Sequence, residues 1–178
     1  MQKIYNVAMK SLNIKQVIGL LLIIIWMVVI FLFSNQQGNA SSVTSNKVTK
    51  EIIEVLPSTK NLEENQKNEI VKKVNPIMRK IAHYTIYLIG GILIMFFIST
   101  IVQSEKRGVL YSILIGLAYA ITDEIHQMFM DGRTAKVTDV FIDTLGVITG
   151  IVIYLTIKKI LYCIKSKDNK SIVKVKNK

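Results

Sequence analysis

The sequence predicts an all-α integral membrane protein, a four-helix bundle with an external amphipathic helical segment between spans one and two. Two observations carry this prediction. Of the 178 residues, 51% are hydrophobic and the mean hydropathy is +0.40, which is high for a soluble domain of this length. The hydrophobic residues also come in long blocks, each able to cross most of a hydrocarbon core of about 30 Å at about 1.5 Å per residue. The length allows one membrane domain and no separate soluble enzyme module.

The net charge of +11 lies mostly beside the apolar blocks, in the N-terminal segment, one short loop and the C-terminal tail. Lysine and arginine in such places set the orientation of a membrane protein and contact anionic lipid. We therefore expect the lipid bilayer as a partner and no nucleic acid. The single cysteine, Cys163, excludes an internal disulfide.

The apolar blocks place four spans within a membrane domain of residues 17–164, at about 17–33, 77–102, 109–130 and 139–164. A signal peptide is the alternative for the first block, since three lysines precede it, but its apolar stretch is longer than a typical signal-peptide core. We favour a retained anchor. Asn75 is expected to cap the second span with Pro76 at its first position, and Thr138 to cap the fourth.

The segment between spans one and two, residues 34–75, is polar and is expected to be external. Within it Val48, Ile52 and Val55 recur at helical spacing, which predicts an amphipathic helix ending near Pro57. A second short helix is expected at about residues 61–74. Residues 1–16 form the N-terminal segment, and the basic tail, residues 165–178, is expected to be disordered.

Basic residues favour a cytoplasmic location for both termini. With four spans, the N-terminal segment, the 103–108 loop and the C-terminal stretch from Lys158 to Lys178 lie on one side, and they hold three, two and eight Lys and Arg residues. The other side has two in its short loop. Its long segment has six, or eight when Arg79 and Lys80 at the start of the second span are included, but five glutamates are interleaved with the lysines of the segment. We expect a multi-pass protein of the cell membrane with both termini inside.

Each predicted span brings its polar residues to the same outer leaflet, whereas the inner halves of the spans are almost purely apolar. Several of these groups would lie on the order of 10 Å below the surface, where an ionisable residue costs up to roughly 2–3 kcal/mol. They must therefore face one another or a wet cavity. The residues expected in this polar pocket are Gln36, Lys80, His83, Tyr87, Asp123, Glu124, His126, Gln127, Arg133, Asp139 and Asp143.

Two histidines and several carboxylates in one pocket suit acid–base chemistry, because burial and neighbours can move their pKa values towards neutral. The candidate catalytic residues are His83, Asp123, Glu124 and His126. The candidate substrate-binding residues are Lys80, Tyr87, Gln127, Arg133, Asp139, Asp143 and Gln36, with Lys80 and Arg133 suited to an anion.

Other interpretations of the same residues remain open. They could form only a hydrogen-bonding network that ties the helices together. Asp123 and His126 are spaced to offer two metal ligands, but no histidine pair has the spacing of a zinc-protease helix. No metal and no cofactor is therefore expected. Gly146 and Gly150 would let a neighbouring helix pack closely against the fourth span.

Five sequence motifs stand out together: Phe33-Ser34-x-Gln36-x-Gly38, Lys80-x-x-His83-x-x-x-Tyr87, Asp123-Glu124-Ile125-His126-Gln127, Gly132-Arg133 and Asp139-x-x-x-Asp143-x-x-Gly146-x-x-x-Gly150. In these motifs the chain resembles the VanZ-like family of small bacterial membrane proteins, named for a protein associated with low-level teicoplanin resistance. The resemblance covers roughly residues 20 to 155. Where such proteins often have proline before Gly-Arg, this chain has Asp131. The resemblance implies a polytopic protein linked to the cell envelope and supplies no reaction.

Three functions remain open. The first is an enzyme acting on a lipid-linked or cell-wall-associated component, such as an envelope precursor, with a link to glycopeptide (teicoplanin) tolerance and antibiotic resistance. The second is a non-catalytic binder of such a lipid or of the drug. The third is a small proton-linked transporter, which the one-sided distribution of polar residues disfavours. The sequence does not predict an oligomeric state.

Overall fold

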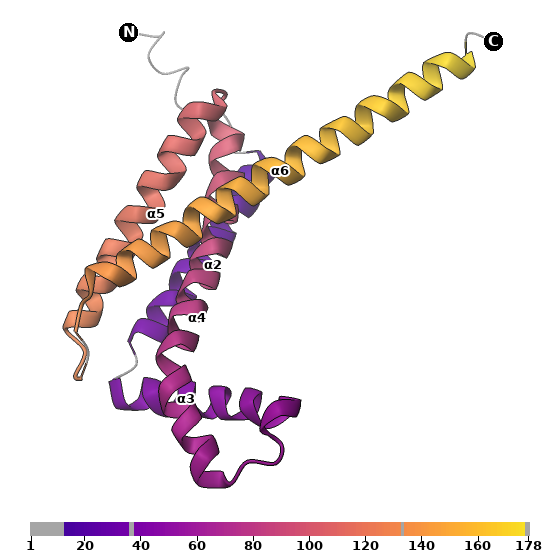
Figure 1. The fold of residues 1–178 in the computed structure, drawn as a ribbon. Coiled ribbons are helices and arrows are strands. Elements are labelled where there is room, and N and C mark those ends of the chain that lie inside the picture. The colour runs from indigo at the N-terminus through magenta and orange to yellow at the C-terminus, as the bar shows by residue number, and fades with distance from the viewer. Residues whose placement is uncertain (1–12, 36–37, 133, 177–178) are drawn as a thin grey trace, which may run out of the picture.

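The computed structural model describes residues 13–35, 38–132 and 134–176, and within them all regular structure is helical (Figure 1). Four of the helices are long and apolar enough to cross a membrane, namely α2, α4, α5 and α6, which confirms the predicted helical membrane bundle. The elements are α2 (Ile14–Ser34), α3 (Gly38–Val55), the 3-10 helix η1 (Pro57–Thr59), α4 (Glu64–Ile101), α5 (Glu105–Met128) and α6 (Val137–Lys176).

Helix α4 is the centre of the bundle, since it packs against α2, α5 and α6 and also against α3. The core at these contacts is built from buried side chains of all four spans: Trp26, Ile30, Tyr87, Ile94, Met95, Ile98, Ala120, Val147 and Ile151. By contrast, most Ile, Leu and Val side chains of α2 are exposed on the bundle surface. An apolar exterior of this kind suits contact with lipid chains.

Glycines bring α4 and α6 into backbone contact, as the sequence predicted. A Cβ atom added to Gly150 would lie 2.0 Å from the Leu88 carbonyl oxygen, and one added to Gly146 would lie 2.4 Å from that of Tyr84. Gly91 makes the reciprocal approach to α6. No side chain fits in these gaps, so the two helices cross where small residues leave their backbones uncovered.

The start of the second span differs from the prediction. Helix α4 begins at Glu64 with Glu63 as its N-cap, and Pro76 lies inside the helix. Asn75 does not cap a helix, because its side-chain oxygen accepts hydrogen bonds from the hydroxyls of Ser45 at 2.7 Å and Thr49 at 3.3 Å. The predicted short helix at 61–74 and the second span are therefore one helix, which α3 supports beside the proline.

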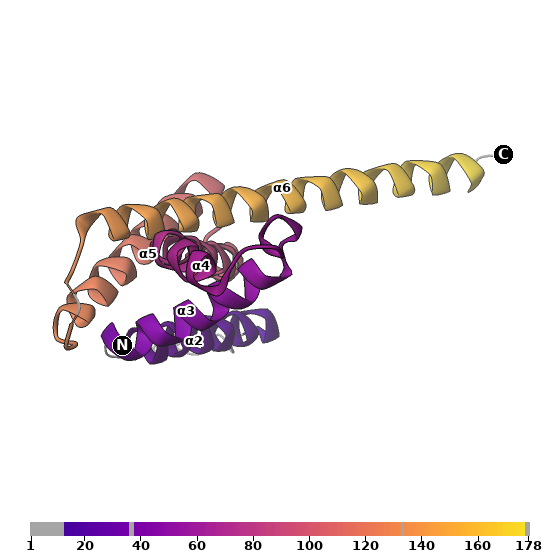
Figure 2. The same cartoon turned by 60° about the horizontal axis from the view of Figure 1, so that its bottom comes forward.

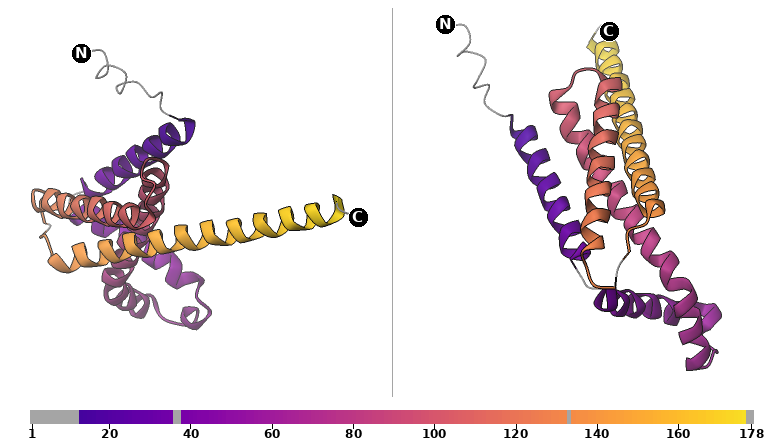
Figure 3. Two further views of the ribbon diagram at one scale, coloured as in Figure 1. Left: turned by 90° about the horizontal axis from the view of Figure 1, so that it is seen from above. Right: turned by 90° about the vertical axis from the view of Figure 1, so that its left-hand side faces the viewer.

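Helix α3 lies across one end of the bundle, roughly perpendicular to the spans (Figure 3, right). Figure 2 shows the same end turned forward, where α3 packs against α4. Thr49 and Ile53 face inward and are buried, whereas Val48, Ile52 and Val55 are exposed. The helix lies where it was predicted and ends close to Pro57, but the predicted apolar stripe of Val48, Ile52 and Val55 is not the face that packs on the bundle. We call this end of the molecule, where α2 and α5 end and α6 begins, the α3 end.

Helix α6 is longer than the predicted fourth span at both ends. It begins at Val137, so Thr138 lies inside the helix rather than capping it, and it continues to Lys176. The predicted disordered tail is thus helical through most of its length and reaches beyond the other helices (Figure 1, yellow). No glycine or proline follows Gly150 to interrupt it.

Candidate functional site

A polar pocket of about 200 Å³ opens at the α3 end, between α4, α6 and the segment that joins α5 to α6. Charged and polar side chains dominate its wall, in contrast to the apolar bundle around it. Its lining residues are Pro76, Arg79, Lys80 and His83 of α4, Gln127 of α5, Gly132, Thr134 and Lys136 of the joining segment, and Asp139, Ile142 and Asp143 of α6.

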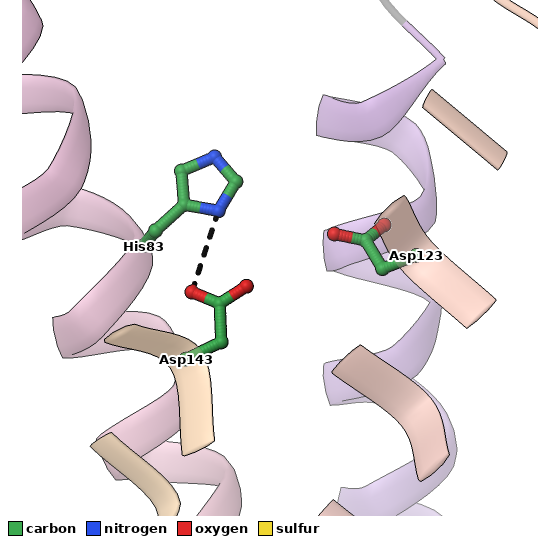
Figure 4. Close-up of side chains that lie close together, drawn as sticks. All are labelled: His83, Asp123 and Asp143. Carbon is green, nitrogen blue, oxygen red and sulfur yellow. Dashed lines mark ion pairs between the residues drawn. The ribbon is translucent and has the colours of Figure 1, made fainter. Parts of the chain in front are cut away.

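A histidine–carboxylate contact in the pocket joins α4 to α6. Nδ1 of His83 lies 3.6 Å from Oδ1 of Asp143, whose side chain is 0% exposed, whereas the His83 side chain is 33% exposed. Asp123 of α5 faces this pair (Figure 4), and one ligand-type atom of each of the three residues lies within 4.8 Å of the others. The glycine crossing of α4 and α6 brings His83 and Asp143 this close.

Asp123 is held in place from two sides. Its Oδ1 accepts a short hydrogen bond from the Ser34 hydroxyl at the end of α2. Its Oδ2 accepts one from Nε2 of Gln127 at 3.0 Å, one helical turn further along α5. Asp123 and Gln127 are 5% and 7% exposed. The carboxylate is therefore fixed in direction and kept away from bulk water.

Tyr87 lies beneath the pocket, fully buried in the core. Its ring packs edge-on against Trp26 with centroids 5.7 Å apart, and the indole N–H of Trp26 donates to the carbonyl of Ile86 at 2.8 Å. The Tyr87 hydroxyl is buried and has no hydrogen-bond partner within the described ranges, although Asp123 and Asp143 are its electrostatic neighbours.

Cations surround the mouth of the pocket. Arg79, Lys80 and Lys136 line it, and none of the three forms an ion pair with another described residue. The backbone N–H of Lys136 donates to Oε2 of buried Glu124 at 2.9 Å, which ties the joining segment to α5. The mouth therefore presents unpaired positive charge above a carboxylate-rich interior.

The structure brings together most, but not all, of the residues that the sequence singled out. Lys80, His83, Gln127, Asp139 and Asp143 line the pocket, and Asp123, Glu124 and Tyr87 are buried beside or beneath it. His126 turns to another side of α5, where its ring stacks on Phe31 of α2 at 4.9 Å. Gln36 and Arg133 lie outside the described residues.

Sequence reasoning missed Arg79 and Lys136 as pocket residues. Arg79 is adjacent to Lys80, and Lys136 lies three residues from both Arg133 and Asp139, which the sequence singled out. The proximity of Arg79 and Lys136 depends on how α4 continues past Pro76 and how the joining segment folds back towards it. The sequence shows that both residues are basic, but it does not show that they line the same pocket.

Comparison with protein families gives a match over residues 19–159 to the VanZ/LLP1 family model. The chain belongs to the VanZ/LLP1 family. The match includes most of each of the four membrane helices and every described residue of the pocket. Comparisons with curated proteins and with solved structures gave no match. The family resemblance read from the sequence is thus confirmed, and this VanZ-family chain is a membrane protein with four apolar helices.

Proposed function

We propose that this VanZ-family protein binds the anionic headgroup of a lipid-linked cell-envelope component in its polar pocket. The observation that carries the proposal is the positive charge of Arg79, Lys80 and Lys136 around the mouth, none of which has an ion-pair partner among the described residues. Basic side chains that converge without internal partners favour phosphate or carboxylate ligands. Because the pocket lies at the end of an apolar bundle, a lipid headgroup could bind in it while the hydrocarbon chains of the same lipid remain in the bilayer.

The size of the pocket favours a headgroup over a whole drug. Pockets that enclose drug-sized ligands measure about 300–1,000 Å³, whereas this one is about 200 Å³. A glycopeptide such as teicoplanin is far larger than this volume. Any link to teicoplanin tolerance would therefore act through the envelope component that is bound, rather than through enclosure of the antibiotic.

The proposed location is the outer leaflet, with both termini in the cytoplasm. The basic α4–α5 loop and the lysines of α6 lie away from the α3 end and support this orientation. Cysteine labelling tests it in a Cys163→Ser background. Cysteine introduced at exposed Glu54 of α3 should react with a membrane-impermeant thiol reagent in intact cells, whereas cysteine at exposed Lys167 should react only after permeabilisation. The reverse pattern would refute the orientation.

Acid–base chemistry on the bound component is the second candidate, and the contact between His83 and Asp143 favours it. An imidazole supported by a carboxylate at the base of a pocket can move a proton to or from a bound headgroup. Buried Glu124 is close by but is occupied by the backbone of Lys136. Lipid and wall-precursor profiles of cells with and without the protein separate the two candidates, because a new modified species would favour an enzyme.

Binding itself is testable with purified protein in detergent. A short-chain polyprenyl phosphate should bind, and the matching uncharged polyprenol should bind at least about tenfold more weakly, because the lost contacts are charge-assisted. Lys80→Ala should weaken binding of the phosphate but not of the alcohol. Lys60→Ala, which removes an exposed lysine outside the pocket, is the control. Equal affinity for both lipids would refute the proposal.

A further inference from the structure

Three side chains from three different helices converge on one point at the base of the pocket. His83 of α4, Asp123 of α5 and Asp143 of α6 each bring one possible ligand atom to within 4.8 Å of the other two (Figure 4). In the sequence these residues are far apart and no spacing links them. Their convergence results from the packing of α4 against α5 and α6.

Asp143 is the residue whose environment is incomplete. Its side chain is 0% exposed, and neither carboxylate oxygen has a hydrogen-bond partner among the residues that the structure describes. The contact with His83, at 3.6 Å, is longer than a hydrogen bond, and Nδ1 of His83 is equally buried and unpartnered. A buried carboxylate without hydrogen bonds carries a desolvation cost of several kcal/mol unless a cation compensates it.

The neighbouring groups support a cation at the same point. Asp123 is oriented by Ser34 and Gln127, and each of its oxygens keeps a further lone pair after accepting one hydrogen bond. Hydrogen bonds of this kind, which fix the direction of a ligand from behind, are typical of metal sites. The buried hydroxyl of Tyr87 adds a further oxygen without a hydrogen-bond partner in the described part of the chain.

We infer that His83, Asp123 and Asp143 bind one divalent transition-metal cation, with Zn²⁺ and Mn²⁺ as the best candidates. An imidazole nitrogen with two carboxylates suits these ions better than Mg²⁺ or Ca²⁺, which favour sites made of oxygen alone. Ligand atoms at about 2.1 Å from one tetrahedral ion lie about 3.4 Å apart. His83 and Asp143 are already 3.6 Å apart, and the other separations, none longer than 4.8 Å, would shorten by at most about 1.4 Å.

This inference departs from the sequence-based expectation of no metal, which rested on the lack of a histidine pair at zinc-protease spacing and weighed only Asp123 and His126 as ligands. The structure places His126 against Phe31 and brings His83 to Asp123 instead. The inference goes beyond the proposed function. The cations at the mouth would bind an anionic headgroup with or without an ion below them, so either proposal can fail while the other stands. When bound, such an ion would attract the same anionic groups from the interior side.

The test uses the purified full-length protein in detergent, freed of metal with a chelator and then exposed to ZnCl₂ or MnCl₂. After desalting, elemental analysis should find about one ion per chain, and the thermal unfolding temperature should rise with ion concentration. Asp143→Asn and His83→Gln should retain less than about a tenth of that metal. Asp139→Asn, which alters a pocket carboxylate outside the cluster, should retain the wild-type amount.

Misfolding is not a sufficient explanation for metal loss in Asp143→Asn. That variant replaces a buried carboxylate that has no hydrogen-bond partner among the described residues, so without metal it should unfold at the wild-type temperature or above it. Absence of bound metal in the wild type, or equal metal in wild type and Asp143→Asn, would overturn the inference. Lys80→Ala should bind metal normally while losing polyprenyl phosphate, which keeps this test separate from that of the proposed function.

Discussion

Substitution of Gly150 by alanine should separate α4 from α6 and destabilise the protein. The added Cβ would lie 2.0 Å from the Leu88 carbonyl oxygen and 3.0 Å from the backbone nitrogen of Ile92. Both contacts are with backbone, so no side-chain rotation can relieve them. To reach an ordinary contact of 3.4 Å from 2.0 Å, the helices would have to move apart locally by about 1.4 Å.

The magnitude follows from two opposing effects. Overpacking of a tight interface costs typically 1–3 kcal/mol, and replacing a helical glycine by alanine returns up to about 1 kcal/mol. Since the clash is with backbone, we expect a net loss of about 2 kcal/mol, or roughly 4–8 °C in unfolding temperature for a chain of this length. Gly108→Ala is the matched control. There the nearest atom to the added Cβ is Cε of Met95 at 3.5 Å, so no clash arises.

Trp26, the single tryptophan, reports the unfolding by its fluorescence because it packs in the core against Tyr87. Gly150→Ala should unfold several degrees below the wild type, and Gly108→Ala at or slightly above it. If the two variants had the same unfolding temperature, the backbone contact between α4 and α6 would not be the constraint described here.

Three further substitutions test the polar contacts that position the site. Asn75→Ala removes the acceptor of two α3 hydroxyls at a buried position and should cost about 1–3 kcal/mol; hydrogen exchange in α3 should then speed up while α5 is unchanged. Trp26→Phe loses the hydrogen bond to the carbonyl of Ile86 and should lower the unfolding temperature by a few degrees, followed by circular dichroism; an unchanged value would contradict the contact. Ser34→Ala frees one oxygen of Asp123 and should weaken Zn²⁺ binding about 10–100-fold, the usual cost of losing a ligand's supporting partner, in metal titrations with Asp139→Asn as control.

The membrane architecture could be predicted because it depends on the hydrophobicity summed over each long segment. Four apolar blocks predict four helices regardless of detail, since lipid leaves the backbone no alternative to internal hydrogen bonding. Gly146 and Gly150 could be assigned to a helix contact because only small residues allow close approach. The polar residues could be assigned to the same end of the bundle because consecutive spans run in opposite directions.

The remaining features depend on which neighbour each helix meets. Helical spacing predicts that Asp123 and His126 project to similar sides of α5. In the structure the His126 ring stacks on Phe31 of α2, whereas Asp123 faces His83 and Asp143. Pro76 predicts a helix start from its missing N–H, but the preceding turns are already helical and are held by α3 through Asn75. These outcomes depend on tertiary contacts that local pattern does not encode.

The central claim is that α4, α5 and α6 turn their charged residues into one pocket for an anionic headgroup. An experimental structure of the protein in lipid nanodiscs, with a polyprenyl phosphate added, tests it most directly. The account predicts His83 and Asp143 in contact inside the pocket and phosphate density beside Lys80 at its mouth. Carboxylates of Asp123 and Asp143 pointing separately towards lipid chains, with no lipid phosphate at the α3 end, would contradict it.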